Sequence, residues 1–181
     1  MAIVSYGLKI TEAYHIFDKT IKTYHNAVHY ISDIVIRHYD ELKSLESITG
    51  DDGKVIISAQ QRRQQKMERL IHSTANNDAT YKRFDKEFYK FPSYLRRDAI
   101  NTAIGLILSY RSQLQKWEDD GKHGRRPYLN RNQNTMPCFY RNNTFLDSEE
   151  TNIVSLKLYN GKDWIWETFV IRDCDFMYAY K

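Results

Sequence analysis

The chain has 181 residues, the length of one ordinary domain or of two small domains that share an interface. Lys and Arg exceed Asp and Glu by 27 to 23, so the net charge is +4, and this balance alone does not predict nucleic-acid binding. The two cysteines form no metal-binding or disulfide framework, which favours a reducing, cytoplasmic location. The longest apolar run is far shorter than the roughly 20 residues of a membrane span, so we expect no membrane partner.

The N-terminal part of the chain predicts a short strand followed by a long helix. Residues 3–9 alternate between apolar and more polar side chains, as a strand with one apolar face does. Thr11 then has the residue type of a helix N-cap. From Tyr14 to Leu45 apolar residues recur every three or four positions, which predicts one helix that packs its apolar stripe against a partner helix.

Turn residues divide the rest of the helical part. Residues 49–53 contain two glycines and two aspartates and are expected to end the first helix. Ser58 is the expected N-cap of a second helix with few apolar positions, and a shorter helix is expected near residues 81–89. Residues 93–118 predict a long helix that is apolar on more than one side and therefore buried.

The pattern changes after this helix. Residues 122–134 are basic, rich in Asn and poor in apolar side chains, which indicates a loop or a ligand-facing segment. A hairpin turn is predicted at residues 161–163. Short strands are predicted at residues 138–142, 153–160, 164–172 and 175–181.

These elements together predict an α+β fold. A lone N-terminal strand is marginal and needs the later strands as partners. We therefore expect a small β-barrel or sheet built from residues 1–10 and 120–181, interrupted by a helical bundle insertion at residues 11–119.

No catalytic centre and no cofactor site is predicted. P-loop, GxGxxG and nucleophile-elbow motifs are absent, and nearly all carboxylates lie in predicted turns rather than on the buried strand that a two-metal nuclease needs. His25, His29 and Asp33 share one face of the first helix, which leaves two interpretations: a polar flank of the bundle, which we favour, or part of a metal site. His38 lies in the apolar stripe, where we expect it to hydrogen-bond a neighbour.

Basic and aromatic residues gather in three places, where we predict contacts with nucleic acid. The Gln- and Arg-rich helix either reaches phosphates and base edges or is a plain solvated face. At the helix start near Ser93, free N–H groups and paired arginines suit phosphate, and a tyrosine suits base stacking. The third place is the segment 122–131. The predicted contact residues are Gln60, Arg62, Arg63, Tyr94, Arg96, Arg97, Asn101, Arg111, Lys116, Arg125, Arg126 and Tyr128.

The chain resembles the TnpB (OrfB) family of transposon-encoded, RNA-guided nucleases in three segments: FPSYLRRDAINTAIGLILSYRSQLQKWE at 91–118, MPCFYRNNTFLD at 136–147, and LYNGKDWIWETF at 158–169. The resemblance implies a wedge domain, an oligonucleotide-binding-like barrel, interrupted by a helical recognition domain. It also implies guide RNA and duplex DNA as partners. The family's RuvC carboxylates and zinc ribbon have no counterpart before Lys181, so we expect no nuclease activity and no metal.

Three functions stay open on the sequence. The first, which we favour, is a nucleic-acid-binding module. The second is a helical interaction or regulatory protein, derived from a truncated transposase, that pairs its apolar stripe with another chain. The third is a nuclease completed by a RuvC-containing partner chain. Salt-dependent RNA binding separates the first from the second, and metal-dependent cleavage identifies the third.

Overall fold

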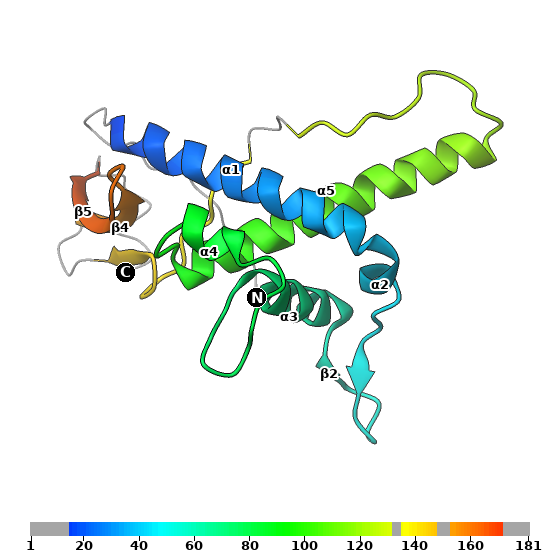
Figure 1. Cartoon of the computed structure of the whole chain (residues 1–181), viewed down its shortest axis with the longest axis horizontal. Coiled ribbons are helices and arrows are strands. Elements are labelled where there is room, and N and C mark those ends of the chain that lie inside the picture. Colours follow the sequence, from blue (N-terminus) through cyan, green and yellow to red (C-terminus); the bar gives the residue numbers. More distant parts are fainter. Residues whose placement is uncertain (1–14, 132–134, 148–152, 172–181) are drawn as a thin grey trace, which may run out of the picture. The chain divides into compact units, whose positions relative to one another are not determined.

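The computed structural model describes residues 15–131, 135–147 and 153–171 (Figure 1). The predicted strands at 3–9 and 175–181 and the predicted helix cap at Thr11 lie outside these residues.

The described residues divide into two compact units, which we call the helical unit and the strand unit. The helical unit comprises residues 23–131 and 135–137, and the strand unit comprises residues 15–22, 138–147 and 153–171. In this division the loop after residue 120 belongs with the helices, whereas the sequence-based prediction placed it with the strands.

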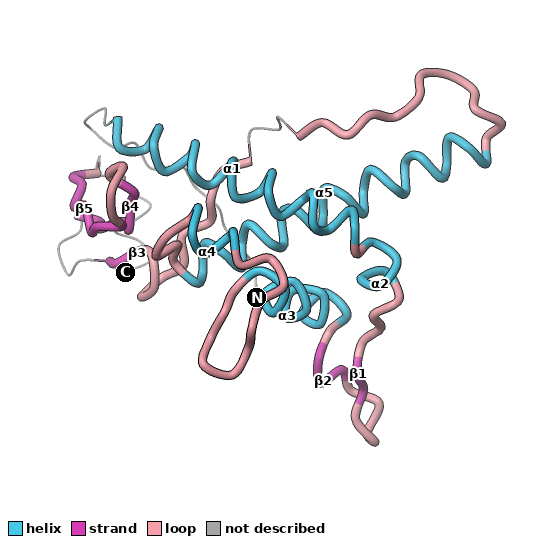
Figure 2. The backbone as a smooth tube through the Cα atoms, in the orientation of Figure 1, coloured by secondary structure: helices cyan, strands magenta, loops and turns pink. Residues whose placement is uncertain are grey.

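Five helices and two small antiparallel sheets make up the regular structure of the described residues, which confirms the prediction of a mixed α and β protein (Figure 2). The strands described here form no closed barrel. Within the described part of the chain, every helix is too short or too polar to span a membrane.

Helix α1 (His15–Arg37) buries the apolar stripe that its repeat predicts, including Tyr24, Ile31 and Val35. The predicted continuation to Leu45 is wrong. His38 leaves helical geometry, with a φ of −105° and a ψ of 17°, and a separate short helix follows, α2 (Tyr39–Lys43).

The break at His38 coincides with two side-chain contacts. Nε2 of His38 lies 3.0 Å from the hydroxyl of Tyr81, and Nδ1 lies 3.1 Å from Glu41, which confirms the expected hydrogen bond to a neighbour. Hydrogen bonds from Lys66 and from His38 lower the pKa of Glu41 below its ordinary value. Glu41 therefore joins the helix break to helix α3 (Ala59–Ile71) through a 2.5 Å ion pair with Lys66.

A hairpin joins α2 to α3. The sequence predicted only a turn here, but β1 (Ile48–Thr49) and β2 (Val55–Ile57) pair antiparallel on either side of Gly53, whose φ is 75°. The predicted cap of α3 is confirmed, because the hydroxyl of Ser58 accepts a hydrogen bond of 3.1 Å from the backbone N–H of Gln61.

Four aromatic rings pack together beneath α1. Tyr30 comes from α1, Phe84 and Phe88 belong to or follow α4 (Arg83–Glu87), and Phe91 precedes the last helix. The centroid of the Phe84 ring lies 4.8 Å from that of Phe88, 5.8 Å from that of Tyr30 and 6.1 Å from that of Phe91. Phe84 has no exposed surface, so it lies at the centre of this cluster.

Helix α5 (Ser93–Asp119) is buried over its first half only. Its fully or nearly buried residues end at Ile107, and Leu114 and Trp117 keep partial exposure. The sequence predicted burial along the whole helix. The second half extends past α1 and α3 in the helical unit, so its apolar side chains lack a complete partner face (Figure 1).

Tyr24 connects α1 to α5 through buried hydrogen bonds. Its hydroxyl donates to Asp98 at 2.7 Å and lies 3.0 Å from the hydroxyl of Thr102. Tyr24 is fully buried and Asp98 is 9% exposed, so water cannot easily replace the bond.

Replacing Tyr24 with Phe is therefore expected to lower the free energy of unfolding by about 1 to 3 kcal/mol, because a buried carboxylate loses a donor. Urea unfolding measures this loss. Tyr128→Phe is the control, because Tyr128 is 66% exposed. Equal unfolding midpoints for the two variants would show that the hydroxyl of Tyr24 does not stabilise the helix pair.

The strand unit contains a three-stranded antiparallel sheet in the order β3 (Phe145–Asp147), β4 (Ile153–Tyr159) and β5 (Trp164–Val170). Val154, Leu158 and Phe169 form its buried face, and Phe17 at the start of α1 packs on it with its ring centroid 5.1 Å from that of Phe169.

The strands predicted at 153–160 and 164–172 are confirmed as β4 and β5, which end at Tyr159 and Val170, and the strand predicted at 138–142 is wrong. The hydroxyl of Thr144 accepts from the backbone N–H of Tyr140 at 2.7 Å, and Asn142 has a φ of 64°. These features make a tight turn, and the strand begins only at Phe145.

Candidate nucleic-acid interface

The loop that follows α5 leaves the helix through a glycine cap. Gly121 has a φ of 72°, its N–H donates to the carbonyl of Glu118, and the N–H of Lys122 donates to the carbonyl of Trp117. This is the bonding pattern of a Schellman motif, which stops a helix and turns the chain back. Trp117 then donates its indole N–H to the carbonyl of Gly124 at 3.3 Å, so the start of the loop is fixed against the helix.

The far end of the loop is fixed on α1. Nε2 of His29 lies 2.5 Å from the carbonyl oxygen of Arg131, and Nε2 of His25 lies 2.6 Å from that of Thr135. Asp33 forms a 2.6 Å ion pair with the guanidinium of Arg131. The three residues considered as metal ligands therefore bind the loop, and the described residues contain no group of three or more His, Cys, Asp or Glu side chains that could hold a metal ion.

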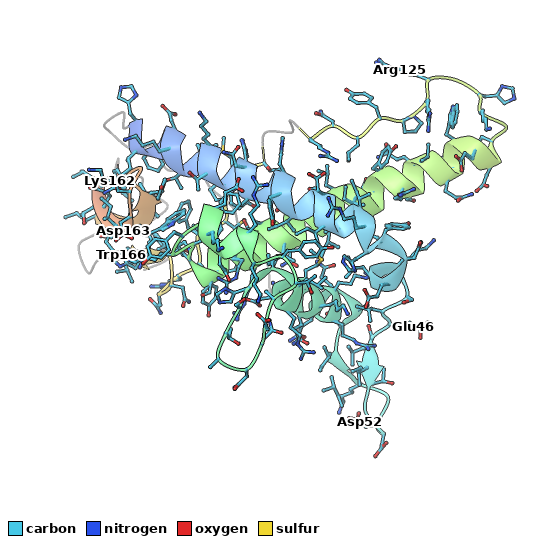
Figure 3. The ribbon with its side chains drawn as sticks, in the orientation of Figure 1. Glu46, Asp52, Arg125, Lys162, Asp163 and Trp166 are labelled. Carbon is cyan, nitrogen blue, oxygen red and sulfur yellow. The ribbon has the colours of Figure 1, made fainter. Side chains whose placement is uncertain are left out.

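Cationic side chains on this loop lie over aromatic rings. The guanidinium of Arg125 is 5.5 Å from the centre of the Tyr128 ring, and that of Arg126 is 5.9 Å from the centre of the Trp117 ring. Tyr128 is 66% exposed, and Figure 3 shows Arg125 on the outer part of the loop. We call Trp117, Lys122, Arg125, Arg126 and Tyr128 the loop surface.

The positive charges of the loop surface are available to a ligand. Lys122, Arg125 and Arg126 are exposed, and among the described residues none of them forms an ion pair. The loop surface is therefore exposed, basic and aromatic, and it is held at both ends.

The helix start near Ser93 differs from the prediction. Arg96 is 7% exposed, and its Nη2 donates to Glu68 at 3.0 Å, while Nε of Arg97 donates to the other oxygen of Glu68 at 3.3 Å. Arg97 also lies over the ring of Tyr94 at 5.6 Å. Arg96 is therefore largely buried against Glu68, and the prediction that it contacts nucleic acid stays a prediction.

The predicted residues on α3 are largely engaged within the chain. Arg62 donates to the carbonyl of Glu46 at 2.7 Å, and Arg63 donates to that of Leu42 at 2.9 Å, so both bind backbone that precedes the hairpin. The side chains of Gln60 and Asn101 bond one another at 3.0 Å. Arg62 and Arg63 are partly buried, and the prediction that they contact nucleic acid stays a prediction.

Arg111 and Lys116 line a cavity of about 820 Å³ beside the second half of α5. Tyr39 and Lys43 of α2 line it as well, with the guanidinium of Arg111 5.0 Å and the ammonium of Lys43 5.8 Å from the centre of the Tyr39 ring. The structure thus places one predicted residue, Arg111, over an aromatic ring, and the other, Lys116, in the lining of the same cavity.

Sequence reasoning missed several aromatic residues that accompany the basic ones. Tyr39 was missed because α2 was expected to continue the first helix. Trp117 was predicted only as part of the buried helix at 93–118, although its position directly before the basic segment is a usable signal. In the strand unit, Trp166 is 41% exposed (Figure 3). The ammonium of Lys157 lies 5.4 Å from its ring, a pairing that only the strand register reveals.

The fold and this geometry define a mixed α and β protein with an exposed, anchored loop of basic and aromatic residues. The chain matches the model of the Aq_aa04 family over residues 3–160, and it belongs to that family. No curated protein and no solved structure matches the chain significantly. The description of the family names no activity and gives no link to TnpB proteins, so the TnpB resemblance stays a prediction.

Proposed function

We propose that this protein binds unpaired nucleic-acid strands through the loop surface. The observation that supports the proposal best is the pairing of arginines with aromatic rings, Arg125 with the exposed Tyr128 and Arg126 with the partly exposed Trp117. Arginine pairs well with phosphate oxygens, and aromatic rings stack on unpaired bases of any sequence.

The anchoring of the loop supports the same proposal. A loop that must be ordered on binding loses part of its affinity to that ordering. Here Trp117 holds one end of the loop and His29 and Asp33 hold the other. The basic side chains are therefore presented from a largely formed backbone.

The rival function is that the apolar stripe of α1 pairs with another chain. The burial of this stripe within the chain does not support it. The stripe residues Tyr24, Val28, Ile31 and Val35 are buried within this chain. They have almost no exposed surface to offer a second protein.

In a finer proposal, the bound nucleic acid is the guide RNA of a TnpB-like system, with duplex DNA beside it. Further β-strands complete a wedge barrel, and a partner chain supplies the RuvC chemistry. The order of the elements supports it, since helices precede an antiparallel sheet. The test is to purify the chain from its own host and sequence the bound RNA. A single RNA species from a transposon end supports the assignment, and a random mixture of RNA contradicts it.

Removing both loop arginines tests the main proposal. We expect the Arg125→Ala and Arg126→Ala double variant to bind single-stranded oligonucleotides more weakly than the parent does, whatever their base sequence. Its salt dependence should flatten by about 0.7 for each phosphate that the variant no longer neutralises. Fluorescence anisotropy across a salt series measures both quantities.

The matched control removes two positive charges elsewhere in the helical unit. Lys82 and Lys86 are both exposed on or beside α4, so the double alanine variant there has the same net charge. We expect it to bind nearly as the parent does. If both double variants lose the same affinity and the same salt slope, binding depends on net charge and the loop surface is not the site.

A further inference from the structure

A second polar site lies in the helical unit, between the end of α3 and the start of α5. It is an open cavity of about 650 Å³, and its lining includes Glu68, Arg69, His72, Asn76, Arg96 and Arg97. None of these residues belongs to the loop surface.

Positive charge exceeds negative charge in this cavity. Glu68 is the one carboxylate among the lining residues, and it is shared by the guanidiniums of Arg96 and Arg97. Arg69 is exposed, and its side chain forms no ion pair within the described residues. Three guanidiniums against one carboxylate leave two positive charges for a ligand.

Arg96 has an unused donor in a buried position. Its side chain is 9% exposed, Nη2 bonds Glu68, and the buried Nε has no hydrogen-bond partner in the part of the chain that the structure describes. Native proteins rarely leave a buried donor unpaired, and a donor of a charged group least of all. Arg96 is also one of the residues that line the cavity.

The walls of the cavity are held in place. Asp85 accepts from Nδ1 of His72 at 2.8 Å and from the backbone N–H of Ser73 at 2.8 Å, which fixes the imidazole. Asn77 donates to the carbonyls of Arg69 and His72, both at 2.8 Å, so the end of α3 is capped and the following turn is fixed. Such supporting hydrogen bonds pre-organise the residues that meet a ligand.

We propose that this cavity binds a phosphate monoester, either the terminal phosphate of a nucleic-acid strand or the phosphate of a free nucleotide. A monoester carries close to two negative charges near neutral pH, which matches the excess of two positive charges. Guanidinium groups are the side chains best suited to phosphate oxygens. A cavity of this size also has room for a mononucleotide.

The test uses inorganic phosphate and adenosine 5′-monophosphate as probes, with affinity measured by calorimetry on the whole chain. The Arg69→Ala and Arg97→Ala double variant should bind both probes about tenfold more weakly or worse, the loss expected for charged hydrogen bonds. Both residues are exposed, so this variant should fold, and a thermal melt checks that it does. The Arg125→Ala and Arg126→Ala variant should keep the parent affinity for both probes, whatever happens to its binding of long strands.

Oligonucleotides with and without a 5′-phosphate separate the two sources of the monoester. Tighter binding of the phosphorylated strand, lost in the double variant of Arg69 and Arg97, assigns the cavity to a strand end. Equal binding of the two strands, with adenosine 5′-monophosphate still bound, assigns it to a free nucleotide. If the parent binds neither probe, or the folded double variant binds both as tightly as the parent, the cavity is not a phosphate site.

Discussion

Replacing Phe84 with Ala is expected to lower the free energy of unfolding by about 3 to 5 kcal/mol. Phe84 has no exposed surface and its ring packs between those of Tyr30, Phe88 and Phe91. The truncation removes this ring packing and leaves a cavity that the surrounding rings fill only in part. Urea unfolding followed by circular dichroism measures the change.

Tyr89→Ala is the matched control for Phe84. Tyr89 lies directly after Phe88 and is 65% exposed, so we expect a change within about 0.5 kcal/mol. A small loss for Phe84→Ala, comparable with that of the control, would mean that the aromatic cluster does not hold α1, α4 and α5 together.

Replacing Glu68 with Ala is expected to cost about 3 kcal/mol of stability, near the lower end of the range for breaking a buried ion pair. The Arg96 side chain is 9% exposed, and without Glu68 its positive charge is left without a carboxylate. The Glu68 side chain is itself 21% exposed, so water relieves part of the penalty.

A double-mutant cycle separates the ion pair from simple packing. Replacing Arg96 with Met in the Glu68→Ala background removes the unpaired charge and should recover most of the lost stability. If the double variant is less stable than Glu68→Ala alone, the arginine stabilises the protein through contacts other than Glu68.

Elements set by neighbouring residues were predicted well from the sequence. Ser58 caps α3 through a bond to Gln61 three positions later, and the start of α5 at Ser93 follows a Pro that breaks the preceding chain. The end of α1 was missed, and at the break His38 contacts Tyr81, which is 43 positions away. Local patterns carry no information on such a partner.

Distant partners also explain why the contacts of the candidate site were predicted only in part. Arg96 and Arg97 look equivalent in the sequence, but helix geometry turns Arg96 inward to Glu68, 28 positions earlier. The basic character of the loop could be predicted from Arg125 and Arg126. Its anchoring on His29 could not, because the two bonded residues are 102 positions apart.

The most direct test of nucleic-acid binding at the loop surface is ultraviolet crosslinking of the whole chain to a uridine-rich single-stranded RNA, with the crosslinked residues located by mass spectrometry. We predict crosslinks at Trp117 and Tyr128 that weaken as the salt concentration rises, since phosphate contacts are salt-sensitive. Crosslinks at the exposed Trp166 alone would place the site in the strand unit. That result, or the absence of salt-dependent crosslinking, would contradict the proposed function of the loop surface.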